Sequence, residues 1–365
     1  METANYLSPA SNPELLGHEK AESLLLQALN AQRLHHAWLI SGPRGIGKAT
    51  LAYRFAKYVL ANLTGEANLF DNAFMLAENP GSLYLSSDHP TFQRVAAGGH
   101  ADVLVVEKSE NKQGNLSPVI IAEDVRNVRK FFHMTAGEGG WRVVILDTAD
   151  EMNVHASNAL LKILEEPPSR ALLMLISHNP GRLLPTIRSR CQSIRLEPLG
   201  SSVLAELLSS RAPNMPATDL EIISIFAEGS IGRALEVLEL DGFSIYEDIL
   251  RLFEAGAGTD NRALHAFASK ITSKKGRDTF ILTSELIRWQ LGRIIKYAAR
   301  DCGKDLTARE QVLFERISCA SGLDRWLDVW EKVDDLIASV DHSNLDRKQA
   351  ILNIFFFFSE AAGAQ

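Results

Sequence analysis

Apolar and polar positions form two kinds of segment over the first 200 residues. Short, largely apolar runs predict β-strands, and the longest of them have the composition of strands covered on both faces. These runs lie at residues 37–41, 103–106, 142–147, 171–177 and 192–196. Between them, apolar residues recur at helical spacing in residues 21–34, 49–63, 123–131 and 154–166. Strands that alternate with helices in this way are typical of a parallel α/β sheet.

From residue 201 onward the strand pattern ends and only helical spacing remains. We therefore expect three domains: an α/β core over residues 1–198, a small helical domain over 199–242 and an all-helical module over 243–365. Residues 64–116 contain a looser connection whose shape the pattern does not define.

Composition excludes several classes of protein. The chain has 365 residues and a net charge of −7, and its most apolar run, residues 351–358, is far shorter than the ~20 residues that cross a bilayer. The N-terminus lacks the apolar segment of a secretory signal. The three cysteines lie too far apart for a zinc knuckle or a disulfide framework, so we expect no zinc and a cytoplasmic location. The acidic balance argues against a protein that binds nucleic acid unaided.

A glycine-rich loop, with sequence GPRGIGK, follows the first predicted strand and precedes a predicted helix. It fits the G-x-x-x-x-G-K pattern of a phosphate-binding loop (P-loop). Gly42, Gly45 and Gly47 let backbone N–H groups close around phosphate oxygens, and Lys48 reaches the outer phosphates.

The residue after this pattern leaves open whether the loop binds a nucleotide. Ala49 stands where the pattern has a Ser or Thr that holds Mg²⁺, and Thr50 comes one position late. One interpretation is a site for ATP or ADP with Mg²⁺. The other is a strand-to-helix turn that needs glycines only for its geometry.

The run VVILD, which ends at Asp147, has the form of a Walker B strand whose carboxylate faces a metal. The alternative is a buried strand that ends in an Asp capping a turn. An active ATPase of this type has Glu next, to orient the attacking water, but here the next residue is Thr148. We therefore do not expect hydrolysis at this site.

The segment PTIRSRCQ, residues 185–192, places arginines before the last predicted strand. A guanidinium stabilises a phosphoryl transition state, and one supplied by a neighbouring subunit, an arginine finger, is worth on the order of 10³–10⁵ in rate. The alternative, which the chemistry alone favours, is a solvated basic edge formed by Arg188, Arg190 and Arg195.

Three segments together resemble the AAA+ clamp-loader family of bacterial DNA polymerase III, and within it the delta-prime subunits. They are HAWLISGPRG at residues 36–45, SNALLKILEEPP at 157–168 and SRC at 189–191. In this family the SRC arginine is the finger that acts in trans, so the resemblance assigns that role to Arg190. It also places Asn179 near the sensor 1 position and Arg233 at the sensor 2 position.

The resemblance implies a fold and a function. The fold is an AAA+ P-loop core with a helical lid over residues 199–242 and a C-terminal helical collar through which subunits assemble. The function is that of a largely non-hydrolysing subunit of the clamp loader, in a ring with motor subunits and a delta subunit. That complex loads the sliding clamp on primed DNA for the replicative polymerase. No membrane partner is expected.

Two departures from the family and two rival functions remain. Glu is absent after Asp147, unlike in the motor subunits, and no cysteine precedes Cys191, so the four-cysteine zinc module of many relatives is missing or metal-free. One rival is a self-sufficient AAA+ ATPase, such as a motor subunit, whose turnover would depend on Lys48. The other is a pure scaffold in which the loop is a relic and Arg190 only packs.

Overall fold

The computed structural model describes residues 8–31, 33–63, 82–108, 117, 119–137, 140–256, 260–273, 276–300, 306–343 and 345–363. Two compact units divide the chain, and each is described by itself. The core unit comprises the described residues within 5–206 and 228–233. The helical unit comprises those within 207–227 and 234–365.

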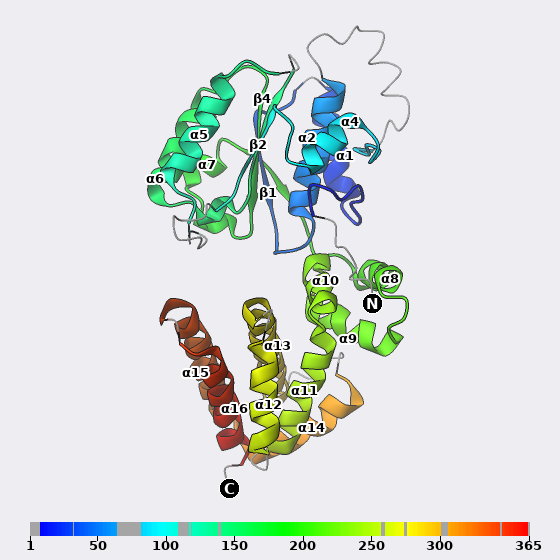
Figure 1. Ribbon diagram of the computed structural model, residues 1–365, viewed down its shortest axis with the longest axis vertical. Helices are drawn as coiled ribbons and strands as arrows, with labels where there is room; N and C mark the ends of the chain where they lie inside the picture. Colours follow the sequence, from blue (N-terminus) through cyan, green and yellow to red (C-terminus); the bar gives the residue numbers. More distant parts are fainter. Residues whose placement is uncertain are drawn as a thin grey trace. The chain divides into compact units, whose positions relative to one another are not determined.

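A five-stranded parallel sheet forms the centre of the core unit (Figure 1). Its strands are β1 (Ala37–Ser41), β2 (Val103–Val106), β3 (Arg142–Leu146), β4 (Ala171–Ser177) and β5 (Gln192–Arg195), in the order β2-β3-β4-β1-β5. All four pairings are parallel, so the carboxyl ends of the five strands share one edge. Each predicted strand is confirmed to within one residue.

Helices cover both faces of this sheet (Figure 1). One face carries α1 (Glu19–Asn30), α2 (Lys48–Asn62) and α4 (Pro90–Ala96). The other carries α5 (Ala122–His133), α6 (Val154–Glu165) and α7 (Pro185–Arg188). Two 3₁₀ turns, η1 (Ala149–Glu151) and η2 (Pro180–Arg182), follow β3 and β4.

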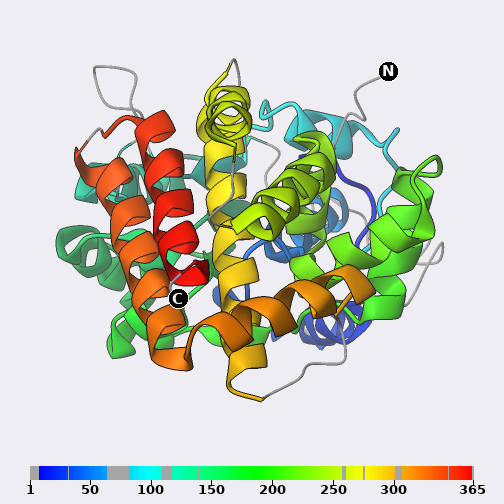
Figure 2. The same ribbon diagram turned by 90° about the horizontal axis from the view of Figure 1, so that it is seen from below.

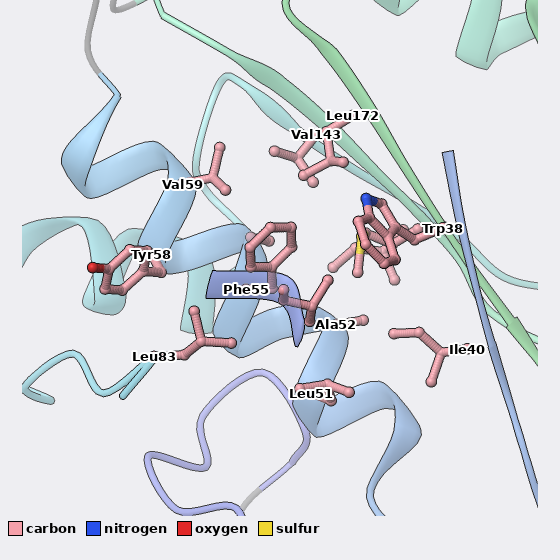
Figure 3. Packing of buried hydrophobic residues seen from close by; sticks show 14 of the residues in the cluster. Trp38, Ile40, Leu51, Ala52, Phe55, Tyr58, Val59, Leu83, Val143 and Leu172 are labelled. Atoms are coloured by element: carbon pink, nitrogen blue, oxygen red, sulfur yellow. The ribbon is translucent and has the colours of Figure 1, made fainter. Parts of the chain in front are cut away.

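Strand β1 supplies apolar side chains to both layers, which explains its continuous apolar sequence. Trp38 and Ile40 belong to the cluster that α2 covers, whereas Leu39 belongs to the cluster on the opposite face. Figure 3 shows Trp38 and Ile40 on one side of the first cluster, with Leu51 and Phe55 of α2 filling the layer beside them. Burial on both faces fixes the position of the loop that follows β1.

The helical unit contains no strand among its described residues. Its helices are α9 (Ala217–Ala227), α11 (Gly242–Ala255), α12 (Asn261–Ile271), α13 (Gly276–Ala298), α14 (Ala308–Ala320), α15 (Leu323–Ser343) and α16 (Arg347–Ala362). Helices α15 and α16 run side by side (Figure 2). The predicted fold class, a parallel α/β sheet with a P-loop followed by an all-helical region, is thus confirmed.

Two helices, α8 (Ser201–Arg211) and α10 (Ile231–Glu239), are divided between the units. The predicted domain limits at residues 198 and 242 stay predictions. Of the loose connection at 64–116, residues 82–108 contain α4 and β2, and residues 64–81 and 109–116 lie outside the described residues. Among the described helices, none is long and apolar enough to cross a membrane.

Candidate functional site at the two edges of the sheet

The loop that connects β1 to α2 needs glycine at three positions. Gly42, Gly45 and Gly47 have φ values of +147°, +75° and +104°, a region that residues with a Cβ rarely adopt. Space is also limiting, because a Cβ on Gly42 would lie 2.5 Å from the carbonyl oxygen of Leu196 and one on Gly45 would lie 2.4 Å from Ser230 Oγ. The glycines of the P-loop pattern are therefore structurally required, as both interpretations of the sequence expected.

Lys48, the first residue of α2, is folded back over its own loop. Only 3% of it is exposed, and its ammonium donates to the carbonyl oxygens of Gly42, at 2.8 Å, and Pro43. Burial lowers the pKa of Lys48 to about 8, although the nearby carboxylates of Asp147 and Asp150 act in the opposite direction. An ammonium has three N–H donors, so these two contacts leave one for a phosphate oxygen.

The neighbours of Lys48 on α2 lack an exposed hydroxyl. Ala49 packs against the apolar cluster beneath α2, and Thr50 is buried. The structure therefore offers no hydroxyl ligand at the position where the P-loop pattern holds Mg²⁺. In the part of the chain that the structure describes, no group of three or more His, Cys, Asp or Glu side chains could hold a metal ion.

Two carboxylates follow the neighbouring strands β2 and β3. Burial, together with the charge of Asp147, raises the pKa of Glu107, and burial with both carboxylates raises the pKa of Tyr53 to about 12. Asp147 Oδ1 accepts a hydrogen bond from the N–H of Thr148 at 2.8 Å. The site thus pairs a buried ammonium with an acidic pair, and Thr148 supplies no carboxylate to orient water.

Asp150 ties the end of β3 to the end of β4. Its carboxylate accepts hydrogen bonds from the N–H groups of His178 at 2.9 Å and Asn179 at 3.1 Å. Burial opposes ionisation of Asp150, but these and other hydrogen bonds hold its pKa below the ordinary value. Burial and the nearby Lys48 lower the pKa of His178. Asn179, the expected sensor 1 residue, therefore lies at the same edge as the P-loop.

The start of α10 packs against the P-loop within the core unit. The N–H of Gly232 donates to the carbonyl oxygen of Gly45 at 2.8 Å, and Ser230 Oγ donates to another carbonyl of the loop at 2.9 Å. A Cβ on Gly232 would lie 2.8 Å from the Cα of Gly45. Arg233, the expected sensor 2 residue, is thus beside the loop, and its guanidinium pairs with Glu228 at 3.7 Å.

Arg190 lies at the opposite edge of the sheet from these groups. It follows α7 and precedes β5, whose first residue, Gln192, pairs with Trp38 near the start of β1, whereas the P-loop follows Ser41 at its end. Because a strand rises about 3.3 Å per residue, roughly 10–15 Å of β1 separates the two edges. The structure does not bring Arg190 to the P-loop of its own chain.

A comparison of the sequence with known protein families identifies one family that includes the P-loop and the segment around Arg190. The family described as "DNA polymerase III, delta subunit" matches residues 17–200, half of the chain. This chain belongs to that family. The delta-prime clamp-loader resemblance indicated by the sequence motifs is therefore confirmed.

Curated relatives of this member of the DNA polymerase III delta-subunit family are themselves named as subunits of DNA polymerase III. DNA polymerase III subunit delta' of Pseudomonas aeruginosa is 38% identical over 195 residues, which cover 53% of each chain. The gamma subunit of Buchnera aphidicola is 27% identical and the match covers 63% of this chain and 58% of the relative. A solved gamma subunit-related protein of Thermotoga maritima is 17% identical, covers 93% of this chain and 99% of its own, and has a TM-score of 0.47. The chain spans about half the length of the curated relatives it matches.

Several residues that lie at the site in this member of the delta-subunit family were not predicted from the sequence. Glu107 comes directly after a predicted strand. Because ligands bind at the carboxyl ends of the strands in parallel sheets, this position could have predicted it as a site residue. Asp150 is three residues from Asp147, but its hydrogen bonds to the end of β4 depend on strand order. Glu165 lies in the SNALLKILEEPP segment, but nothing in the sequence indicated that it contacts Arg190.

Proposed function

We propose that this chain acts as the delta-prime subunit of a DNA polymerase III clamp loader in the cytoplasm. It assembles with motor subunits and a delta subunit, helps to load the sliding clamp on primed DNA for the replicative polymerase, and presents Arg190 to the ATP site of a neighbouring motor subunit. The observation that carries this proposal is the position of Arg190, partly exposed at the sheet edge opposite the P-loop of its own chain.

The chemistry of a guanidinium supports this role. Arg190 is permanently charged and presents planar N–H donors that match phosphate oxygens. Since the strand β1 lies between Arg190 and the P-loop, a phosphoryl group that Arg190 stabilises has to come from another subunit. Arg190 then acts by electrostatic stabilisation and makes no covalent bond.

The contacts of the chain's own P-loop argue against hydrolysis there. Lys48 is engaged by loop carbonyls, Ala49 offers no Mg²⁺ ligand and Thr148 offers no base for water. The residues at positions 49 and 148 would have to differ in a self-sufficient ATPase. The P-loop residues are therefore proposed to support the fold and the position of Arg233, without turnover.

The decisive experiment measures DNA- and clamp-stimulated ATP turnover by the reconstituted loader with Arg190→Ala. We expect turnover to fall at least tenfold, because losing an arginine finger slows its site by on the order of 10³–10⁵. Arg195→Ala is the matched control, since Arg195 and its partner Glu197 are both highly exposed. Gel filtration verifies that each complex is assembled.

Two results would contradict this function. Unchanged turnover by an intact Arg190→Ala complex would make the chain a scaffold. ATP turnover by the isolated chain that Lys48→Ala abolishes would make it a self-sufficient ATPase.

A second candidate property is nucleotide binding without hydrolysis. The left-handed glycines and the buried Lys48 favour it, because the loop keeps the backbone form that surrounds phosphate. Gly42, Gly45, Gly47 and Lys48 would hold the phosphates of ATP or ADP, and Asp147 would supply a carboxylate for Mg²⁺. Isothermal titration of the isolated chain with ADP tests this: binding should disappear in Lys48→Ala, and absence of binding by the native chain would reject it.

A further inference from the structure

The guanidinium of Arg190 is held by two elements of the core unit. Its Nη2 lies 2.9 Å from Glu165 Oε1, at the end of α6, and its Nη1 donates to the carbonyl oxygen of Thr186 in α7 at 3.0 Å. The Arg190 side chain is 37% exposed and that of Glu165 is 50% exposed. The contact is therefore formed at the surface, where water competes with it.

Glu165 is placed where a carboxylate does not help its helix. It is the last residue of α6, and a negative charge near a helix C-terminus is unfavourable because it lies at the negative end of the helix dipole. Exposed ion pairs contribute little to stability because water competes with them, so the contact with Arg190 at best offsets this cost. Stability alone therefore does not explain a carboxylate at this position.

The contact has a clear effect on the geometry of Arg190. A free exposed arginine side chain samples many rotamers, and this conformational entropy is lost when the side chain is fixed on a phosphate. Here two anchors on different helices, α6 and α7, hold the guanidinium before any phosphate arrives. A guanidinium has five N–H donors, so the two contacts leave three for phosphate oxygens.

We propose that Glu165 is a positioning residue for Arg190. It keeps the guanidinium at the surface in one orientation, so that Arg190 meets the neighbouring subunit's phosphates without a search over rotamers. This inference rests on the proposed function of Arg190. Glu165 itself contacts no substrate and acts only through Arg190.

The neighbouring Glu166 provides a matched control. Both glutamates line the same groove between α5 and α6, beside Lys162. Among the described residues, Arg190 pairs with Glu165 and not with Glu166. A general effect of negative charge on this surface would make the two glutamates equivalent, whereas positioning makes Glu165 special.

The test is a double-mutant cycle in the reconstituted loader, with Glu165→Ala, Arg190→Ala and the double variant. We expect Glu165→Ala to lower kcat for DNA- and clamp-stimulated ATP turnover about tenfold with KM unchanged, because a misplaced catalytic group costs up to about 10²-fold. In the Arg190→Ala background, Glu165→Ala should have no further effect. Glu165→Gln, which keeps an acceptor oxygen, should restore most of the activity, and Glu166→Ala should match the native chain.

A measurement on the isolated chain makes the test independent of assembly. ¹⁵N relaxation of the Arg190 side-chain Nε, assigned through Arg190→Lys, reports the mobility of the guanidinium on the ps–ns timescale. We expect Glu165→Ala to increase this mobility and Glu166→Ala to leave it unchanged. Equal mobility in the native chain and Glu165→Ala would overturn the inference even if the variant complex does not assemble.

The outcomes separate this inference from the proposed function. If Arg190→Ala leaves turnover unchanged, the proposed function of Arg190 is wrong. If Arg190→Ala lowers turnover but Glu165→Ala is silent, or has its full effect in both backgrounds, the arginine finger stands and positioning by Glu165 is wrong. Faster turnover in Glu165→Ala would show that Glu165 restrains Arg190, which also overturns the inference.

Discussion

The two units of this protein use an arginine–glutamate pair in opposite ways. In the helical unit, Glu310 is 0% exposed and accepts hydrogen bonds from Arg293 at 2.7 and 3.0 Å, from Gln290 at 2.9 Å and from Thr307. In the core unit, Glu165 meets Arg190 through one contact at a half-exposed surface. The first pair is satisfied on every side, whereas the second leaves donors available.

This difference separates stability from function. Removing one partner of a buried ion pair leaves an uncompensated charge and costs about 3–5 kcal/mol. Removing one partner of an exposed pair costs ~0–1 kcal/mol. A chain that supplies charge to a neighbour therefore places the charge where the fold depends on it least, and Arg190 meets this condition while Arg293 does not.

Glu310→Ala tests the buried half of the comparison and has the largest expected effect. We expect the free energy of unfolding to fall by about 3–5 kcal/mol, since Arg293 and Gln290 lose their shared acceptor. Urea unfolding followed by circular dichroism measures the change. Glu315→Ala, at an exposed position of the same helix α14, is the control. A loss below 1 kcal/mol for Glu310→Ala would remove the distinction between the two pairs.

Lys57→Met tests whether a buried charge in the core unit lowers the free energy of unfolding. Lys57 is 1% exposed, its Nζ has no hydrogen-bond partner among the described residues and lies 3.6 Å from the ring centroid of Phe92, and burial lowers its pKa to about 8. We expect Lys57→Met to raise the free energy of unfolding at pH 7 by about 1–3 kcal/mol. The exposed Lys332→Met should change it by less than about 0.5 kcal/mol.

The pH dependence of the same variant has a definite sign. Between about pH 8 and the ordinary lysine pKa of 10.5, the unfolded chain retains a proton that the folded chain has lost. Stability due to Lys57 therefore rises with pH across this window and is constant below it. Lys57→Met should reduce the rise without abolishing it, because Lys48 contributes in the same direction. Destabilisation at pH 7 would mean that the contact with Phe92 outweighs burial.

Glu165→Ala has the smallest expected effect on stability and sharpens the comparison most directly. We expect the free energy of unfolding to change by less than about 1 kcal/mol, because the pair is exposed and the helix end gains from losing a carboxylate. Urea unfolding of the isolated chain measures it beside Glu310→Ala. A loss as large as that of Glu310→Ala would give Glu165 a structural role and weaken its assignment to Arg190.

The sequence predicted β1, β3 and β4 well because these strands are buried on both faces, which leaves an apolar run such as that of β1. It missed α4, a short helix in the loose connection, although Pro90 at its first position after the capping residue His89 is a recognisable start signal. The P-loop was found because its glycines and lysine are adjacent in the chain.

The contacts around the candidate site depend on tertiary structure. Glu165 and Arg190 are far apart in the sequence, and only the packing of α6 on α7 makes them neighbours. Lys57 lies in an amphipathic helix, where a lysine normally predicts a solvent-exposed position. The sequence pattern therefore did not predict that Lys57 is buried. Local motifs could therefore be predicted, whereas pairing between elements could not.

The close approach of Gly45 and Gly232 links two segments that are almost 190 positions apart. Neither glycine has room for a methyl group while the other segment stays in place. A side chain at either position therefore requires the two segments to move apart. In an alignment of relatives that keep this contact, Gly45 and Gly232 should be retained together and replaced together. A sequence that lost one glycine and kept the other would identify a relative in which the start of α10 has left the P-loop.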